Sequence, residues 1–178
     1  MGGKIKRNNI LFIIYAAVMI IGLILMYVSS YGIPGIIKYY NGFILPDMSF
    51  GYTYEMINNI FNNLGIYGLE QYSYYYAIDF VFILGFAGVQ WSLCDKWVKK
   101  DHFLNKLCKV LVVMRGVFDL AEDVIFMFMI KSILPVSMYV VNIASIITEI
   151  KFIIMGLWMV SFILNIKSLK KFGINYIK

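Results

Sequence analysis

The chain has 178 residues, of which 61% are hydrophobic and 15% charged, with a formal net charge of +6 and a mean hydropathy of +0.78. A soluble domain carries about 45–50% apolar and about 25% charged residues. The composition excludes a disordered chain, a nucleic-acid-binding module and an ordinary soluble enzyme. It predicts a membrane protein that forms a single domain over residues 1–178.

Four apolar segments are long enough to cross the hydrocarbon core of a bilayer, which takes about 20 helical residues. They cover approximately residues 10–28, 72–93, 107–130 and 138–165. Residues 29–71 form a long outer loop, and the other connections are short. We therefore predict an all-α fold, a four-helix transmembrane bundle with an extracytoplasmic loop between its first two spans.

The basic residues predict the orientation of these spans. Twelve of the sixteen Lys and Arg residues lie at the N-terminus, in the connection between the second and third spans, or at the C-terminus: Lys4, Lys6, Arg7; Lys96, Lys99, Lys100, Lys106, Lys109; Lys167, Lys170, Lys171, Lys178. Positively charged loops stay in the cytoplasm. We expect a multi-pass protein of a bacterial plasma membrane, with both termini cytoplasmic.

The first apolar segment could instead be a signal peptide, because basic residues precede it. A signal core has about 7–15 apolar residues and is followed by a small-residue cleavage site. The segment here is longer and has no clear site of that kind. We expect it to stay in the mature protein as a membrane span.

The outer loop contains a predicted amphipathic helix. Thr53 is suited to cap its start and Gly65 to end it after about Leu64. One face carries Met56, Ile57, Ile60, Phe61 and Leu64, and the other carries Asn58, Asn59, Asn62 and Asn63. A helix with so little charge is expected to lie on the membrane surface or to cover the bundle, either as a lid or as a packing element.

Seven ionisable residues lie inside the predicted spans: Asp79 in the second, Arg115, Asp119, Glu122 and Asp123 in the third, and Glu149 and Lys151 in the fourth. Such groups cost several kcal/mol in hydrocarbon unless they are paired, hydrated or protonated. Each is therefore a candidate for function. The other interpretation is structural, with Arg115–Asp119 as an i,i+4 ion pair and the polar side chains joining helices.

Helical geometry predicts which of these groups meet. Arg115, Asp119 and Glu122 share a narrow stripe of the third span, with Asp123 at its margin. Tyr72 and Tyr76 share a face with Asp79, and Asn142 and Ser145 share one with Glu149, whereas Lys151 points away from Glu149. At 1.5 Å per residue, the carboxyls of Asp79, Glu122, Asp123 and Glu149 each lie about 10–14 Å below the outer interface.

The charge count predicts protonation or cation binding. Five acids against two bases leave −3 if all are ionised, and that repulsion is prohibitive in a medium of low dielectric constant. We expect at least one of Glu122, Asp123 and Glu149 to hold a proton at neutral pH. No cofactor is predicted and no metal site is assigned. Cys94, Asp101, His102 and Cys108 match no zinc spacing, and the two cysteines are not expected to form a disulfide.

Several short motifs resemble a known group of sequences. They are Gly42-Phe43-Ile44-Leu45-Pro46-Asp47, Phe50-Gly51-Tyr52-Thr53, Leu64-Gly65 with Gly68 and Tyr72, Asp79, and the run Asp119-x-x-Glu122-Asp123. Together, over residues 42–123, they resemble an uncharacterised group of small bacterial four-span membrane proteins. Its members typically have Asn where Asp123 stands, and an Arg that is missing here. The resemblance implies a shared site of Asp79, Asp119 and Glu122, and no activity.

The functional hypothesis is an outward-facing acidic pocket within the membrane that binds a cation or a small amphiphile, in an accessory or sensor subunit. Asp79, Asp119, Glu122, Asp123 and Glu149 would supply ligands or exchangeable protons. Arg115 would orient Asp119, and Tyr72, Tyr76 and Asn142 would line the entrance. Two alternatives remain open: an enzyme that processes lipids or isoprenoids by carboxylate acid–base chemistry, and a proton-coupled transporter that acts as an oligomer. The expected partners are the lipid bilayer and a homo-oligomer or larger membrane complex.

Overall fold

The computed structural model describes residues 2–97 and 103–171, and its regular elements are helices. In chain order they are α1 (Gly2–Tyr27), α2 (Ile33–Ile37), the 3₁₀ helix η1 (Pro46–Met48), α3 (Tyr54–Trp97), α4 (Phe103–Ile130) and α5 (Met138–Lys171). The described residues contain no strand, which confirms the all-α prediction. The predicted cytoplasmic residues Lys99, Lys100, Asp101, His102 and Lys178 lie outside this part of the chain.

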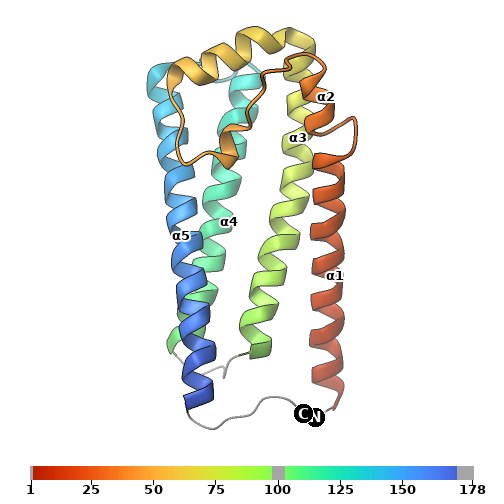
Figure 1. Ribbon diagram of the computed structural model, residues 1–178, viewed down its shortest axis with the longest axis vertical. Helices are drawn as coiled ribbons and strands as arrows, with labels where there is room; N and C mark the ends of the chain where they lie inside the picture. The colour runs from red at the N-terminus through yellow and green to blue at the C-terminus, as the bar shows by residue number, and fades with distance from the viewer. Residues whose placement is uncertain (1, 98–102, 172–178) are drawn as a thin grey trace.

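Four long helical segments run side by side: α1, the part of α3 that follows Gly65, α4 and α5 (Figure 1). Helix α1 packs on α3, α3 packs on α4, and α4 packs on α5. The start of α1 and the end of α5 lie at the same end of the molecule (Figure 1). The chain therefore places both of these helix ends on one side.

Within the described residues, three helices are long and apolar enough to cross a membrane: Asn8–Tyr27, Tyr54–Trp97 and Met138–Leu164. They identify the chain as a membrane protein. The fourth long helix, α4, has 28 residues, but closely spaced charges from Arg115 to Asp123 interrupt its apolar sequence.

The helices extend beyond the predicted spans. The first begins at Gly2 instead of about residue 10, the second long segment begins directly after Gly65 instead of at residue 72, and α4 begins at Phe103. At the other end of the chain, α5 continues to Lys171. Hydropathy marks only the residues suited to hydrocarbon, whereas a helix continues until its backbone hydrogen bonding is interrupted.

The amphipathic helix of the outer loop forms the first part of α3 and lies across one end of the long helices (Figure 1). The backbone N–H of Met56 donates to Oγ1 of Thr53 over 3.3 Å, which confirms the predicted cap. Gly65 breaks the helix with φ 59° and ψ −171°. After this break the chain turns down into the next long segment.

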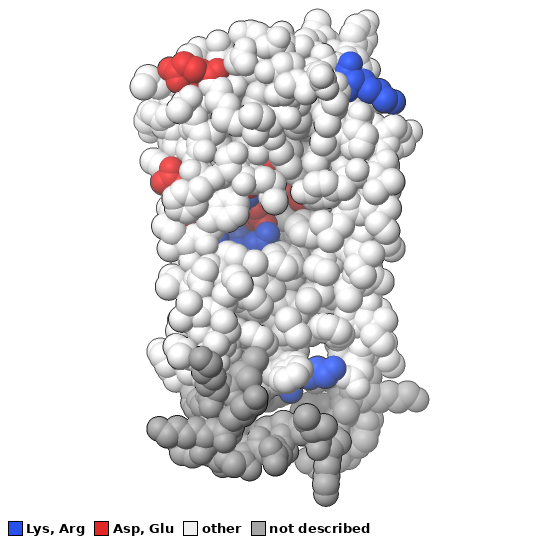
Figure 2. Space-filling view, in the orientation of Figure 1, with Lys and Arg blue, Asp and Glu red and all other residues white. Residues whose placement is uncertain are grey.

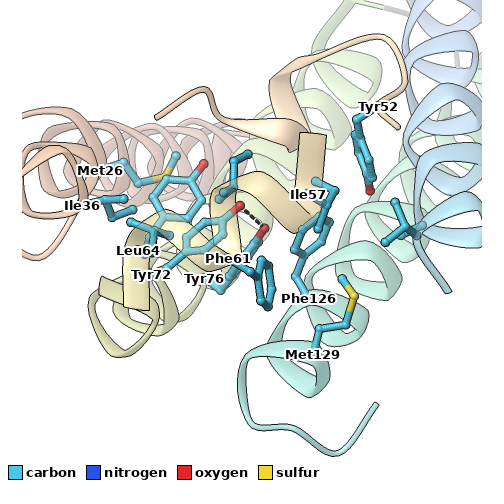
Figure 3. Packing of buried hydrophobic residues seen from close by; sticks show 14 residues of the cluster. Met26, Ile36, Tyr52, Ile57, Phe61, Leu64, Tyr72, Tyr76, Phe126 and Met129 are labelled. Atoms are coloured by element: carbon cyan, nitrogen blue, oxygen red, sulfur yellow. Dashed lines mark hydrogen bonds between the residues drawn. The ribbon is translucent and has the colours of Figure 1, made fainter. Parts of the chain in front are cut away.

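The apolar face of this transverse helix packs on a buried aromatic cluster (Figure 3). Ile57 and Leu64 lie above the rings of Tyr72, Tyr76 and Phe126, none of which exposes more than 4% of its surface. The hydroxyl groups of Tyr72 and Tyr76 are 2.7 Å apart, and the Tyr76 ring stacks on Phe126 with 5.5 Å between ring centroids. This cluster closes one end of the molecule, with the asparagine face of the helix outside.

The first helix approaches α3 closely because glycines face the contact. A Cβ atom at Gly85 would lie 2.6 Å from the backbone nitrogen of Met19, and one at Gly22 would lie 3.0 Å from Cβ of Phe82. Small residues commonly permit such close approach between membrane helices. At these two glycines the backbones of α1 and α3 are therefore in close contact.

Gly65→Ala tests the backbone break. Only glycine adopts this combination of φ and ψ readily, so we expect the substitution to lower the free energy of unfolding by about 1–3 kcal/mol. Unfolding of the detergent-solubilised protein, followed by circular dichroism, measures the change. Gly156→Ala is the matched control: it lies within α5, and neither position has a neighbouring atom within 4 Å of an added Cβ. Equal stability of the two variants would contradict the account.

Candidate functional site

Five acids and two bases lie buried between the helices. They are Asp47 of η1, Asp79 of α3, Arg115, Asp119, Glu122 and Asp123 of α4, and Lys151 of α5. None exposes more than 9% of its surface. We call this set the acidic cluster.

The two bases are held by two of the acids. Arg115 forms an intrahelical ion pair with Asp119, as its i,i+4 spacing predicts. The Nζ atom of Lys151 lies 3.0 Å from Oδ1 of Asp119 and 2.6 Å from Oε2 of Glu122. Lys151 therefore joins α5 to α4 through two carboxylates, and these four groups neutralise one another.

The loop that follows η1 is fixed to the same place by hydrogen bonds. The backbone N–H of Tyr52 donates to Oγ of Ser145 over 2.9 Å. The hydroxyls of Tyr52 and Thr148 both donate to Oε1 of Glu122, over 3.2 and 2.5 Å. Burial, and then the charge of Glu122, raise the pKa of the Tyr52 phenol, so this group stays a donor. Oε1 of Glu122 thus accepts two hydrogen bonds, while Oε2 faces Lys151 in the ion pair.

The 3₁₀ helix brings a further acid, Asp47, into the molecule. The Tyr75 hydroxyl donates to its Oδ2 over 2.9 Å, whereas Oδ1 is buried and has no hydrogen-bond partner among the described residues. Burial raises the pKa of Asp47 to about 7, against the opposing effects of Lys151 and the Tyr75 hydrogen bond. The like charge of Glu122 contributes to this rise in the pKa of Asp47.

Two more carboxyls lack partners in the part of the chain that the structure describes. Asp123 is fully buried, and neither of its carboxyl oxygens accepts a hydrogen bond. Asp79 is 5% exposed and makes no hydrogen bond or ion pair with any described residue. An ionised carboxylate without donors is very costly in an apolar interior. These two groups and Asp47 are therefore the excess acids of the cluster.

A pocket of about 120 Å³ opens beside the cluster. Asp47, Asp79, Arg115, Asp119 and Lys151 line its charged inner wall. Leu23, Met26 and Tyr27 of α1 and Phe152 of α5 flank it. Figure 2 shows acidic and basic atoms at the bottom of a hollow partway along the molecule, surrounded by uncharged residues. The pocket therefore opens sideways between α1 and α5, and its mouth is largely apolar.

The structure brings together five of the predicted residues: Asp79, Asp119, Glu122, Asp123 and Arg115. It does not bring Glu149 to them. Glu149 is only half-buried and lies against Gly51 of the loop instead. Asn142 is exposed and is not among the residues that line the pocket. These two residues lie apart from the cluster because the inward face of α5 carries Val141, Ala144, Thr148 and Lys151, all of them buried.

Tyr72 and Tyr76 also differ from the prediction. Both are fully buried in the aromatic cluster and neither lines the pocket. Its aromatic lining comes from Tyr27, Tyr75, Phe82 and Phe152. The predicted shared face of Tyr76 and Asp79 holds along α3, but the transverse helix covers the tyrosines.

Sequence reasoning missed Asp47, Tyr52, Thr148 and Lys151 as members of the site. For Lys151 a signal existed, because Thr148 and Lys151 are three residues apart and share a helix face opposite Glu149. Asp47 and Tyr52 lie in a loop, whose depth hydropathy does not reveal. Because Asp47 takes the place of Glu149, the count of five acids against two bases is unchanged.

No described group of three or more His, Cys, Asp or Glu side chains is arranged to hold a metal ion. Cys94 and Cys108 are buried and form no disulfide. Comparison of the chain with protein-family models, with curated proteins and with solved structures found no match. A function for this chain is therefore inferred from the geometry of the cluster and its pocket.

Lys151→Met tests the central ion pairs. Removing the ammonium leaves Asp119 and Glu122 short of positive charge, so we expect a loss of about 3–5 kcal/mol in the free energy of unfolding. Denaturant titration in detergent measures it. Lys131→Met is the control, because Lys131 is exposed after α4 and should change stability little. The double variant Lys151→Met/Glu122→Gln should recover part of the loss; no recovery would show that the charges are not coupled.

Asp47→Asn tests the buried loop carboxyl. Since the pKa of Asp47 is about 7 in the folded protein and about 4 in an unfolded chain, the folded state holds the proton more tightly. Stability should therefore fall as the pH rises from about 4 to about 7. We expect Asp47→Asn to remove about 1–2 kcal/mol of the fall between pH 5 and 7, measured by unfolding at both values. The control variant Glu70→Gln, at an exposed position, should keep the full fall in stability between pH 5 and 7. An unchanged fall in Asp47→Asn would contradict the assignment of this fall to Asp47.

Proposed function

We propose that the four long helices all cross the membrane, with both termini in the cytoplasm. Three of them qualify by length and composition. The charges of α4 support its inclusion, because Arg115, Asp119, Glu122 and Asp123 are buried inside the molecule and do not face lipid. Lys96 near the end of α3 and Lys106 near the start of α4 lie where the positive-inside pattern requires them.

We propose further that the lateral pocket binds the cationic headgroup of a small amphiphile. The observation that carries this is the pair of unsatisfied acids in the pocket wall: Asp79 has no partner, and Oδ1 of Asp47 has none, among the described residues. Lys151 and Arg115 also line the pocket, but they already pair with Asp119 and Glu122. Nη1 of Arg115 has no hydrogen-bond partner among the described residues, but the guanidinium lies over the ring of Phe86. The uncompensated charge of the wall is therefore negative.

The position of the opening supports an amphiphile over a free ion. The pocket lies below the transverse helix, which covers the end of the molecule (Figure 1), and opens between two helices with apolar outer faces. In a bilayer, these outer faces contact the acyl chains. A ligand that reaches the carboxyls from this side needs an apolar tail that stays in lipid.

The aromatic lining supports an ammonium headgroup. Tyr27, Tyr75 and Phe82 present rings at the pocket, and the faces of aromatic rings attract ammonium ions. The volume of about 120 Å³ is well above the ~10–15 Å³ that one water molecule needs by the same measure. It therefore suits a headgroup of a few heavy atoms.

Binding of three amphiphiles with the same ten-carbon tail tests the proposal: decyltrimethylammonium, decanol and decyl sulfate. We expect saturable binding of the ammonium compound to the purified protein in detergent, measured by calorimetry. Asp79→Asn should weaken this binding by about 10- to 100-fold, because it removes one charge-assisted contact.

Glu70→Gln is the matched control for Asp79→Asn. Both positions lie on α3 and both changes turn an acid into an amide, but Glu70 is exposed and outside the pocket. The affinity of the Glu70→Gln variant for decyltrimethylammonium should equal that of the wild type. The proposal fails if decanol binds as tightly as decyltrimethylammonium, if decyl sulfate binds instead, or if the two variants behave alike.

A further inference from the structure

The acidic cluster holds more negative charge than its bases can balance. Arg115 and Lys151 neutralise Asp119 and Glu122. Asp47, Asp79 and Asp123 remain, all at least 95% buried. At a separation of a few ångströms, like charges repel by several kcal/mol at the effective dielectric constant of a protein. Without a bound cation, the cluster is therefore compatible with carboxyls that hold protons, and not with three further carboxylates.

The three excess acids differ in their access to the pocket. Asp123 is fully buried and does not line it. Asp47 lines it but accepts a hydrogen bond from Tyr75. Asp79 lines it and has no donor among the described residues. A ligand in the pocket can therefore displace a proton from Asp79 without breaking a hydrogen bond to another side chain.

The groups around Asp79 come from every element packed at this level. They are Tyr27 of α1, Asp47 of η1, Tyr75 of α3, Arg115, Asp119 and Asp123 of α4, and Lys151 of α5. The two bases are committed to ion pairs, and the phenols are neutral. The electrostatic field at Asp79 is therefore set by an excess of acids, which favours a proton there until another positive charge arrives.

We propose that an ammonium group entering the pocket displaces one proton from Asp79, so that the site exchanges a cation for a proton. This inference depends on the proposed binding function and adds that ligand binding is coupled to proton release. In the step, the O–H bond of the Asp79 carboxyl breaks, the proton passes to the bulk buffer, and the carboxylate pairs with the ammonium ion. The net charge of the cluster and its ligand stays the same, so no uncompensated charge enters the low-dielectric interior.

Calorimetry with decyltrimethylammonium in two buffers of different ionisation enthalpy counts the protons released. This probe has no titratable group, so every proton comes from the protein. For wild-type protein at pH 7 we expect release of about one proton per bound ligand. By linkage, the affinity should then rise about tenfold per pH unit over the range in which Asp79 is protonated.

Two variants assign the proton. Asp123→Asn should keep both binding and release, because Asp123 does not reach the pocket. Asp79→Asn should retain only weak binding, and that binding should not vary with pH. Glu70→Gln should release the same proton as the wild type.

The possible failures are distinct. If wild-type protein binds decyltrimethylammonium without proton release, the exchange is wrong while the proposed function stands. If it does not bind the probe, the proposed function itself fails. If Asp123→Asn binds normally but releases no proton, the assignment to Asp79 is overturned.

Discussion

The structure depends on ion pairs between charged side chains that are buried inside an apolar molecule. A single lysine, Lys151, contacts two carboxylates of the neighbouring helix, Asp119 and Glu122, and Arg115 adds a second cation on α4. A buried ion pair stabilises a fold only when its geometry is good and its remaining lone pairs are satisfied. Tyr52 and Thr148 supply those hydrogen bonds to Glu122, so the loop after η1 is required at this depth. The ion pairs thus explain why a polar loop lies among the helices.

The same loop creates the part of the cluster on which the proposed function depends. It brings Asp47 next to Asp79 in the wall of the pocket, after the bases have been committed to other acids. The transverse helix covers the end of the molecule, and the opening lies between α1 and α5. A closed end and a lateral opening favour ligands that approach from the bilayer. The excess of acids favours a ligand that is positive, and it requires protons when no ligand is bound.

Much of this arrangement could be predicted from the sequence. Helical periodicity placed Arg115, Asp119 and Glu122 on one stripe, and the rise per residue placed Asp79 at their level. Thr53 and Gly65 marked the ends of the transverse helix. These predictions succeeded because each depends only on local geometry, which a regular helix fixes from residue spacing alone.

The rest depended on tertiary packing. Residue spacing predicts that the Glu149 face of α5 points inward, whereas Glu149 lies against Gly51 of the loop. Asp47 carried no signal because hydropathy predicts helices that cross a membrane and does not reveal how far a loop folds back between them. Tyr72 and Tyr76 resembled residues of a membrane interface, yet the transverse helix buries them.

The most direct test of the central claim is infrared spectroscopy of the protein in lipid at pH 7. The C=O stretching band of protonated carboxyl groups is separate from that of carboxylates. The account predicts this band in wild-type protein and its reduction in both Asp79→Asn and Asp123→Asn. A spectrum without any protonated carboxyl would show that all five acids are ionised and would contradict the account.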